Sequence, residues 1–327
     1  MARVVLSMSA LAVAFILDCL IGDPPNWQHP VRYLGAAIDY LDKSSRKLFY
    51  SAKGLKIAGL LITVITAGGV FVLSVLFLSA AYRLHPFAGW LLEVYLFFVL
   101  LAGGDLHRHV SKVRSHLATG DLEKARLSAA MLVSRDTSAM DEKGLSRCAL
   151  ESLFENSADG LIAPLFFIAV GGAPLAVLYK AVNTLDSMLG YKNKDYADLG
   201  FFPARLDDIL SYLPSRLTAV LFLLAGGLQG GFKRGLKVLA ADRNKHDSPN
   251  SAWPEAAAAG VLGIKFGGAD YYRGQLINRP VINRAGKAPG AKDIARGLTL
   301  FWVTALLAFG LFLYLYYRLE TGEVFIL

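Results

Sequence analysis

Acidic side chains recur at helical spacing in one polar stretch of the chain, residues 134–159. Glu151, Glu155 and Asp159 are four residues apart, which places three carboxylates along one face of a helix. Like charges at this spacing repel, so the pattern indicates a cation on this face, either a metal ion or an amine. On spacing alone a solvated acidic face is the commoner explanation, and both interpretations stay open.

Four polar residues, Ser-Arg-Asp-Thr at positions 134–137, precede this acidic face. Arg135 offers a planar pair of hydrogen-bond donors, Asp136 offers a carboxylate, and the flanking residues offer two hydroxyl groups. Just before a helix start, these groups are suited to holding a phosphate. The same residue types also form ordinary helix N-caps, so the motif by itself predicts either phosphate binding or capping.

Apolar residues are concentrated in long runs and make up 54% of the 327 residues, which is typical of a membrane protein rather than of a large soluble core. Four runs reach, or nearly reach, across a hydrocarbon layer of ~30 Å at ~1.5 Å per residue. They cover residues 4–21, 57–81, 87–102 and 298–317. A cleaved signal peptide is disfavoured for the first run, because Asp18 and Cys19 replace the small residues expected before a cleavage site.

Two further apolar runs are interrupted or short. Residues 160–182 are cut by Gly-Gly-Ala-Pro at positions 171–174, and residues 217–228 would span only ~18 Å as a helix. We expect both runs to be broken or re-entrant helices, because irregular backbone is tolerated at membrane depth where protein buries it. The predicted fold is therefore all-α: one polytopic integral membrane domain over residues 1–327, with amphipathic and re-entrant helices and polar cytoplasmic loops.

The net charge of +8 is informative through its location. Lys and Arg are abundant in the long polar stretches but sparse in the short links 82–86 and 318–327. By the positive-inside tendency we predict a multi-pass protein of the cytoplasmic (inner) cell membrane. Its site-bearing cytoplasmic loops would cover residues 22–56, 105–159, 183–216 and 229–297. Nucleic-acid binding is disfavoured, because no compact basic domain or aromatic platform accompanies the charge.

Further polar candidates lie in the first and third of these loops. Asp23 and His29 belong to a proline-rich turn, which either holds their side chains at the membrane surface or simply anchors the chain there. Asn183 and Asp186 are three residues apart and can share a helix face. A second charged group, Arg205, Asp207 and Asp208, follows in the same loop. Mg²⁺ prefers a few carboxylates together with waters and substrate phosphates, and this set suits it.

The last polar loop contains Ser-Pro-Asn-Ser at positions 248–251. This turn can cap a helix that begins near Pro254, with Glu255 in the first turn, where the helix dipole favours negative charge. Asn250 can both donate and accept hydrogen bonds. Neither a Walker-type phosphate loop nor a strand-bound GxGxxG is present, so the sequence contains no familiar nucleotide-binding motif.

In this order, the motifs resemble one family, the membrane-bound cobinamide-phosphate synthases of cobalamin (vitamin B12) biosynthesis. The matching pieces are D-C-L-I-G-D-P, H-P-V, S-R-D-T-S, E-S-L-F-E-N-S-A-D-G, A-P-L-F, N-T-L-D-S-M-L-G-Y, A-R-L-D-D, P-S-R-L, S-P-N-S-A-W-P-E-A and G-G-x-x-Y-Y. They extend over residues 18–272, and although each piece is weak, the ordered set is highly specific. One departure is Ala252, where the family usually has glycine.

The resemblance implies an amide-forming ligase. It would join adenosylcobyric acid to (R)-1-amino-2-propanol phosphate or ethanolamine phosphate, consuming ATP and requiring Mg²⁺. Because a carboxylate is a poor electrophile, we expect an acyl phosphate that the amine then attacks. Such a site needs carboxylates for the metal, cations for the phosphates and a base for the ammonium proton.

Residue roles follow from the resemblance as hypotheses. Glu151, Glu155, Asp159 and Asp136 would contact the metal and the amine, and His29, oriented by Asp23, would carry protons. The expected catalytic residues are Glu151, Glu155, Asp159, His29 and Asp23. The expected substrate-binding residues are Arg135, Asp136, Asn156, Asn183, Arg205 and Asn250. The expected metal ligands are Asp186, Asp207 and Asp208.

Two other functions stay open. Transporters place ionisable residues in broken helices at mid-membrane, but most of the acids here lie in loops, which favours surface chemistry. A non-catalytic membrane sensor related to the family could lose these acids, so their presence favours an enzyme. The expected partners are the corrinoid, the amino-alcohol phosphate and membrane lipid, with a homo-oligomer or other membrane enzymes of the pathway as further alternatives.

Overall fold

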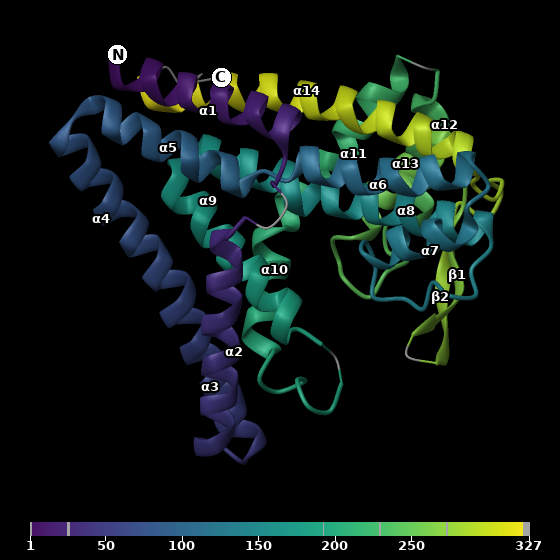
Figure 1. The fold of residues 1–327 in the computed structure, drawn as a ribbon, viewed down its shortest axis with the longest axis horizontal. Helices are drawn as coiled ribbons and strands as arrows, with labels where there is room; N and C mark the ends of the chain where they lie inside the picture. The colour runs from purple at the N-terminus through teal and green to yellow at the C-terminus, as the bar shows by residue number, and fades with distance from the viewer. Residues whose placement is uncertain (1, 25–26, 192, 229, 273, 323–327) are drawn as a thin grey trace. The chain divides into compact units, whose positions relative to one another are not determined.

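The computed structural model describes residues 2–24, 27–191, 193–228, 230–272 and 274–322, and most of them are helical (Figure 1). The elements, in chain order, are α1 (Ala2–Ile21), α2 (Pro30–Leu48), α3 (Ala52–Thr63), η1 (Val64–Gly68), α4 (Gly69–Leu84), α5 (Pro86–Leu100), α6 (Gly103–Ala118), α7 (Leu122–Ala130), α8 (Glu142–Ser157), η2 (Ala158–Ile162), α9 (Ala163–Leu189), α10 (Phe201–Leu210), α11 (Tyr212–Gly227), α12 (Phe232–Asp242), α13 (Ala252–Leu262), β1 (Phe266–Tyr272), β2 (Gln275–Ile282) and α14 (Ala291–Thr321). The elements η1 and η2 are short π-helices.

Five helical segments among the described residues are long and apolar enough to cross a membrane, or six if the bent pair α10–α11 forms one span. Four of them contain the predicted spans: Arg3–Ile21, Ala52–Leu84, Pro86–Ala118 and Ala291–Thr321. The fifth, Glu142–Leu189, contains the run that we predict to be broken. The prediction of an all-α, polytopic membrane protein is therefore confirmed, with one β-hairpin added.

The interruption predicted in residues 171–174 is present inside α9. Gly171 (φ −151°, ψ 21°) and Gly172 (φ 65°, ψ −164°) leave the helical conformation just before Pro174. Gly172 has a positive φ, which glycine adopts without steric strain. The short run at residues 217–228 lies mostly in α11, which is bent by 43° from α10. Whether these broken segments cross the membrane or return stays a prediction.

The contacts within the chain resolve it into two compact units. The first unit comprises Met1–Ala102, Ala163–Ser211 and Leu311–Leu327, and the second comprises Gly103–Ile162 and Tyr212–Gly310. In the first unit α1 packs against α5, α4 and α5 contact α9, and α2 and α10 also lie against α9. Segments that are far apart in the sequence therefore share one core.

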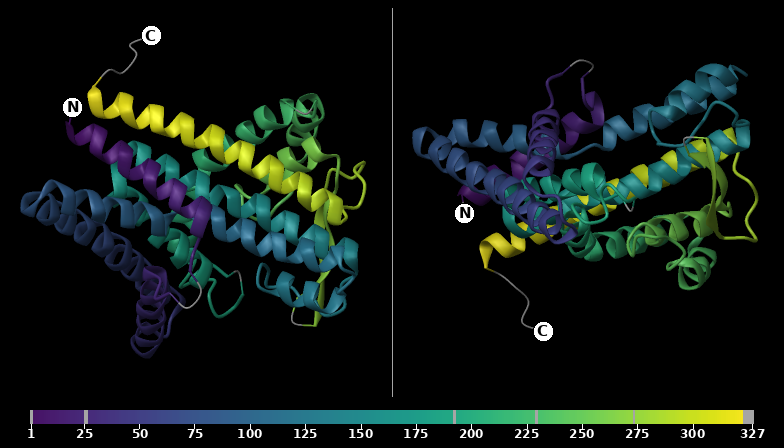
Figure 2. Two further views of the ribbon diagram at one scale, coloured as in Figure 1. Left: turned by 45° about the horizontal axis from the view of Figure 1, so that its top comes forward. Right: turned by 90° about the horizontal axis from the view of Figure 1, so that it is seen from below.

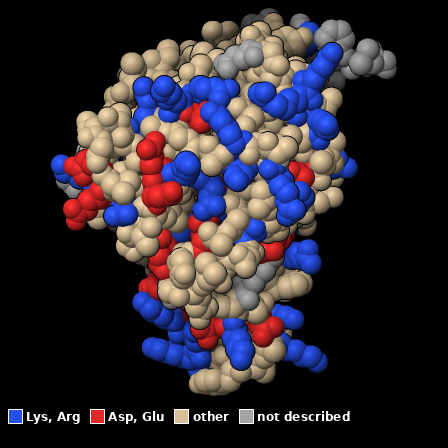
Figure 3. All heavy atoms as spheres, turned by 90° about the vertical axis from the view of Figure 1, so that its right-hand side faces the viewer, with Lys and Arg blue, Asp and Glu red and all other residues tan. Residues whose placement is uncertain are grey.

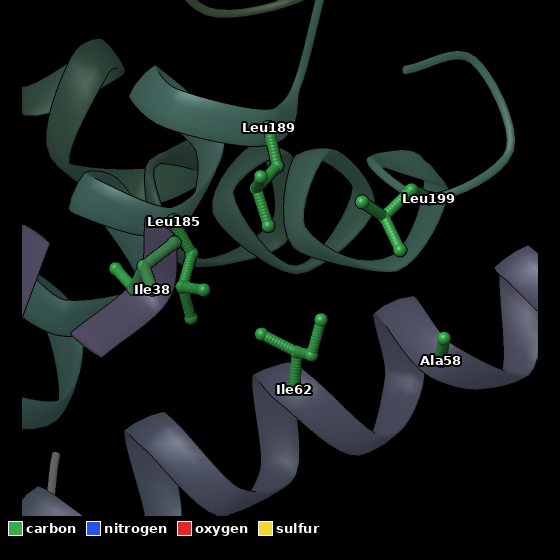
Figure 4. Close-up of a cluster of buried hydrophobic side chains, with 6 residues drawn as sticks. All are labelled: Ile38, Ala58, Ile62, Leu185, Leu189 and Leu199. Atoms are coloured by element: carbon green, nitrogen blue, oxygen red, sulfur yellow. The ribbon is translucent and has the colours of Figure 1, made fainter. Parts of the chain in front are cut away.

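A compact apolar cluster in the first unit joins α2, α3 and α9 (Figure 4). Its members are Ile38, Ala58, Ile62, Leu185, Leu189 and Leu199. Gly59 makes this packing possible, because a Cβ atom at that position would overlap the carbonyl oxygen of Leu199. The cluster holds the end of α9, and therefore Asn183 and Asp186, against its neighbours.

The second unit is built around α8 and α13. Phe154 of α8 packs edge-to-face on Phe222 of α11, with 5.2 Å between ring centroids, and lies 6.1 Å from Phe266 of β1. The four alanines at positions 256–259 of α13 are completely buried. Small side chains let α11 and α12 approach α13 closely, and the views in Figures 1 and 2 show α12 beside α13.

The hairpin β1–β2 was not anticipated by the sequence patterns. The strands pair antiparallel from Phe266 opposite Ile282 to Tyr272 opposite Gln275, with an irregularity between Phe266 and Gly268. The segment lacks the Asn-Gly or Asp-Gly turn and the clean alternation that predict hairpins. Its structural importance lies in its position, because it contributes charged side chains to the interior of the second unit.

Candidate functional site

The acidic face of the sequence analysis lies on α8, and the structure treats its three carboxylates differently. Glu151 is 1% exposed, whereas Glu155 and Asp159 are partly exposed. The α-helix ends at Ser157, and Asp159 belongs to the π-helix η2, so the regular spacing does not continue along one α-helical face. That Asp159 shares a helix face with Glu151 and Glu155 therefore stays a prediction.

The motif at residues 134–137 does not lie immediately before a helix start. The next helix, α8, begins at Glu142, and its N-cap is Asp141, which accepts a hydrogen bond from the Gly144 N–H at 2.8 Å. Residues 134–137 lie in a non-helical connection instead. Phosphate binding at this motif therefore receives no help from a helix N-terminus, and the capping interpretation is wrong as well.

Protein cations, rather than an outside cation, neutralise Glu151. Its Oε2 lies 2.5 Å from Arg135 Nη2 and 3.2 Å from Arg279 Nη1. Arg135 also contacts Asp270 at 3.0 Å, and Arg147 pairs with the other oxygen of Asp270. We call these five residues the arginine-bridged cluster. It joins the 131–141 connection, α8 and the hairpin, which explains why Arg135 is only 8% exposed.

The backbone of the hairpin supplies a further hydrogen bond to the Glu151 carboxylate. The Gly267 N–H donates to Glu151 Oε1 at 2.6 Å, and the Gly267 carbonyl accepts a hydrogen bond from Arg147. Gly267 has φ 76°, and a Cβ atom there would overlap the carbonyl oxygen of Pro280. Only glycine combines this backbone conformation with such close approach. Both carboxylate oxygens of Glu151 are thereby held by protein donors.

A second group of titratable side chains lies beside the first, and we call it the His–Glu cluster. Glu155, His246 and Glu255 each offer a ligand atom, and these atoms lie within 4.8 Å of one another. Among the described residues this is the one set of three or more His, Cys, Asp or Glu side chains so arranged, so it is the best candidate to hold a metal ion. Glu255 is 1% exposed, and its Oε1 has no hydrogen-bond partner among the described residues.

Burial dominates the electrostatics of the His–Glu cluster. It raises the pKa of the Glu255 carboxyl well above its usual range, and the nearby carboxylates of Glu155 and Glu151 raise it further. Burial also lowers the pKa of the His246 imidazole, which favours the neutral ring. The nearest cation to Glu255 Oε1 is Arg279 Nη2 at 3.8 Å, beyond hydrogen-bond distance.

A cavity of about 450 Å³ opens beside both clusters. Its polar lining is Ser134, Arg135, Ser152, Glu155, Asn156, His246, Asp247, Tyr272 and Arg279. Its apolar lining is Leu132, Val133 and Ile277. Basic and acidic side chains are interspersed on the face shown in Figure 3. A cavity with guanidinium, carboxylate and amide groups can bind ligands that carry both phosphate and ammonium groups.

The structure brings several predicted residues of the second unit to this cavity and leaves others away from it. Arg135, Glu155 and Asn156 line it. Asp136 instead accepts a hydrogen bond from the Gly274 N–H at 2.7 Å, in the hairpin. Asn250 accepts one from Arg216 Nη1 at 2.7 Å and is not among the lining residues. Both side chains are used in contacts between loops of the protein. Ligand binding by Asp136 and Asn250 stays a prediction.

The remaining predicted residues belong to the first unit. His29 caps α2, its Nδ1 accepting from the Val31 N–H at 3.2 Å, and its Nε2 lies 3.8 Å from Asp23 Oδ1. Asp207 is buried and accepts a hydrogen bond from Asn183 Nδ2 at 3.3 Å. Asp186 and Asp208 act on Asp207 electrostatically.

Arg205 is exposed on α10 and lies 5.9 Å from the ring centroid of Phe201. Asp186, Asp207 and Asp208 do not bring three ligand atoms within 4.8 Å of one another. The roles of all these first-unit residues stay predictions.

Sequence reasoning missed most of the partners of the acidic face. Asp270 and Arg279 lie in the unpredicted hairpin, and Asp270 is 123 residues from Arg147 along the chain. His246 carries no spacing signal. Glu255 is in the first turn of α13, as predicted, but a helix-dipole explanation gives no hint of its burial. A carboxylate among four alanines was the one available signal that it is buried.

Comparison with known proteins identifies the family. The model of the CobD/Cbib protein family matches residues 11–301. The cobalamin biosynthesis protein CbiB of Salmonella arizonae is 41% identical over 310 residues, covering 94% of this chain and 97% of that protein. The cobalamin biosynthesis protein CobD of Klebsiella pneumoniae is 42% identical over 309 residues, covering 94% and 97%. No solved structure matches this chain. The chain therefore belongs to the CobD/CbiB family, whose named relatives are cobalamin biosynthesis proteins.

Proposed function

We propose that this protein is an adenosylcobinamide-phosphate synthase. It would form an amide between a propionate carboxylate of adenosylcobyric acid and the amine of (R)-1-amino-2-propanol phosphate or ethanolamine phosphate, with ATP consumed. Family membership supports a step in cobalamin biosynthesis. The observation that carries the more specific proposal is the 450 Å³ cavity, where guanidinium groups and carboxylates line the same space.

The size of the cavity suggests which substrate it holds. About 450 Å³ lies within the usual range of small-ligand pockets, roughly 300–1,000 Å³, and suits an amino-alcohol phosphate or part of a nucleotide. A corrinoid is far larger than an ordinary small ligand. We therefore place the amine substrate or the ATP phosphates inside the cavity, with the corrinoid presenting one propionate from outside it.

Arg279 and Asn156 are the side chains best placed to contact phosphate and substrate amide groups. Arg135 donates to both Glu151 and Asp270, so most of its donors are already engaged, whereas Arg279 makes a 3.2 Å contact with Glu151 and lines the cavity. Glu155 and Asp247 provide negative charge for an ammonium group or a cation. The apolar wall at Leu132, Val133 and Ile277 can receive the carbon chain.

Magnesium would act mainly on the transferred phosphate by withdrawing charge from its oxygens. Separately from the cavity of the second unit, Asp186, Asp207 and Asp208 of the first unit stay the proposed ligands of a magnesium ion. The donors to the buried Asp207 carboxylate are neutral, Asn183 Nδ2 at 3.3 Å and Ser211 Oγ at 3.5 Å. Mg²⁺ needs only one or two protein carboxylates when phosphates and waters supply its other ligands.

The position in the cell is also part of the proposal. We place the protein in the cytoplasmic membrane with the cavity of the second unit open to the cytoplasm, where ATP is available. The basic stretches support this orientation through the positive-inside tendency. Single cysteines introduced at exposed positions such as Asp247 should react with an impermeant thiol reagent only in inside-out vesicles. Labelling from the outside would reject this orientation.

The direct test is synthesis of the product by the purified protein in detergent. With adenosylcobyric acid, the amino-alcohol phosphate, ATP and Mg²⁺, mass spectrometry should detect the amide, and omission of any one component should abolish it. Glu155→Gln should lower the rate at least a hundredfold, because glutamine keeps nearly the same side-chain shape but removes the negative charge from the cavity. Glu123→Gln, on the exposed face of α7, is the matched control.

Two results would reject the proposal. One is absence of amide formation by folded wild-type protein with all components present. The other is accumulation of a corrinoid or amine in vesicles without any covalent product, which would favour a transporter. A wild-type rate in Glu155→Gln would leave the ligase standing but remove Glu155 from its site.

A further inference from the structure

The His–Glu cluster combines one imidazole with two carboxylates, and it contains an unsatisfied buried atom. Glu255 is 1% exposed and its Oε1 has no hydrogen-bond partner among the described residues. Buried carboxylate oxygens are normally hydrogen-bonded or paired, and an exception calls for an explanation such as an absent ion. His246 and Glu155 place further ligand atoms within 4.8 Å of the Glu255 carboxylate.

The charges around Glu255 leave room for a cation. Four carboxylates, of Glu151, Glu155, Glu255 and Asp270, face three guanidinium groups, of Arg135, Arg147 and Arg279. Glu151 and Asp270 take up the close contacts of all three arginines. Arg279 is 3.2 Å from Glu151 but 3.8 Å from Glu255, so its charge is largely used by Glu151. Glu155 and Glu255 therefore remain the least neutralised pair.

We propose that Glu155, His246 and Glu255 form a binding site for a divalent first-row transition metal ion, with Zn²⁺ as the representative case. The imidazole decides the metal class, because nitrogen ligands suit Zn²⁺ and its neighbours, whereas Mg²⁺ and Ca²⁺ prefer oxygen ligands throughout. Three protein ligands leave one coordination position open. Glu155 and His246 line the cavity, so the open position would face a ligand bound there.

The site needs only a small contraction to close around a metal. Ligand atoms at about 2.0–2.2 Å from one Zn²⁺ ion are no more than about 4 Å apart, whereas the three ligand atoms here lie within 4.8 Å. Glu155 is partly exposed and can move, while Glu255 is fixed in the buried helix α13. Closing the site around the metal would therefore mainly require the Glu155 side chain to move toward His246 and Glu255.

Metal binding would have a specific structural consequence at Ser248. The Ser248 N–H donates to His246 Nδ1 at 3.0 Å. If Nδ1 ligates the metal, the metal takes the lone pair that accepts this bond. If Nε2 ligates, the ring proton must move to Nδ1. Either way the Ser248 hydrogen bond is lost, so the Ser248 amide reports on metal binding independently of any enzymatic activity.

The experiment is a metal titration of the purified full chain in detergent after treatment with a chelator. Zn²⁺ should bind at about one ion per chain, and Co²⁺ should give the absorption bands of nitrogen and oxygen ligation without the intense thiolate band of a cysteine ligand. Millimolar Mg²⁺ should not displace either ion. In an ¹⁵N spectrum the Ser248 amide resonance should shift on addition of Zn²⁺.

Variants identify the ligands. Glu155→Gln, His246→Gln and Glu255→Gln should each weaken Zn²⁺ binding at least tenfold, whereas the matched controls Glu123→Gln and His116→Gln should leave it unchanged. Less than 0.2 equivalents of Zn²⁺ on folded wild-type protein, as a rough threshold for adventitious ions, would overturn the proposal. So would binding that persists in all three cluster variants.

The proposal can still be rejected if one of the variants does not fold. If Glu255→Gln does not fold, the partly exposed Glu155 and His246 variants decide the result alone. Because the readout is metal binding, the inference does not rest on the proposed ligase reaction. Zn²⁺ binding without amide formation would support the site and reject the function, and amide formation without Zn²⁺ binding would do the reverse.

Discussion

Two buried glutamates of the second unit show how different partners give one residue type different roles. Glu151 and Glu255 are each 1% exposed. Both oxygens of Glu151 contact donors, from Arg135, Arg279 and the Gly267 backbone. Glu255 has one oxygen with no hydrogen-bond partner among the described residues. Burial by itself therefore does not distinguish a structural carboxylate from a functional one, and the distinction comes from the partners.

The largest effect should come from breaking the arginine-bridged cluster. Glu151→Gln removes the charge that neutralises Arg135 and Arg279 while keeping the shape of the side chain. Removing one partner of a buried ion pair typically costs about 3–5 kcal/mol. We expect a loss of that size in the free energy of unfolding, measured by denaturant titration in detergent. The protein would be expected to unfold well below the wild-type midpoint.

Glu155→Gln is the matched control for this comparison, because Glu155 lies one helical turn away on α8 and, within the described part of the chain, has no arginine contact like the 2.5 Å contact of Glu151. It should change the free energy of unfolding by less than about 1 kcal/mol while removing activity. Equal destabilisation of the two variants would show that the arginine contacts of Glu151 add nothing to the stability of the fold.

An intermediate loss of stability should come from a substitution at Gly267, whose backbone N–H donates to Glu151. Gly267→Ala adds a Cβ atom that overlaps Pro280 and forces an alanine into a positive φ. We expect destabilisation of about 1–3 kcal/mol, because the hairpin must shift and its hydrogen bond to Glu151 is disturbed. Thermal unfolding of the purified variant would measure it.

Gly274→Ala separates the two causes. Gly274 has the same φ of 76°, but among the described residues, its chain neighbours aside, no atom lies within 4 Å of the position where its Cβ atom would be. It should therefore be strained without overlap and lose less stability than Gly267→Ala. Equal losses would show that close approach at Gly267 adds nothing to the conformational requirement.

The most gradual effect should appear in the pH dependence of stability through Glu255. Its pKa is raised in the folded protein, so the folded state binds this proton more tightly than the unfolded chain. The stabilisation is fully present below the unfolded pKa of about 4.3 and is lost as pH rises through the folded pKa. The slope should approach about 1.4 kcal/mol per pH unit within that window.

Glu255→Gln removes this titration, so the stability of wild type relative to the variant should decline as pH rises above about 4.3. Unfolding should be followed at several pH values with a chelator present, so that metal binding does not contribute. A constant difference between the two proteins across this range would mean that Glu255 stays ionised in the folded state.

Patterns within single segments accounted for the elements and for part of the site. Long apolar runs identified four membrane spans, and Gly-Gly-Ala-Pro identified the break in α9. The polar stretch at residues 134–159 contributes Arg135, from the connection before α8, and Glu155 and Asn156, from α8, to the lining of the cavity. These predictions succeeded because length, hydropathy and backbone breakers act locally.

Predictions that depended on which segments meet were less successful. The spacing of the acids predicts a bound metal ion or amine on this helix face. Glu151 is paired instead with Arg135 and with Arg279, which is 128 residues away along the chain. The capping interpretation of residues 134–137 failed because α8 begins later than the motif suggests. Spacing along a helix reveals which side chains share a face, but not what the rest of the chain places against it.

The sequence by itself determined that this is a multi-pass helical membrane protein with a concentrated set of acids and arginines, since hydropathy and composition are properties of the chain. Only the tertiary structure decided that Glu151 is neutralised, that Glu255 is buried with no hydrogen bond to Oε1 from the described residues, and that His246 joins it. The physical reason is that the free energy of a charge depends on its solvent exposure and its neighbours, and both are set by segments brought together from distant parts of the chain.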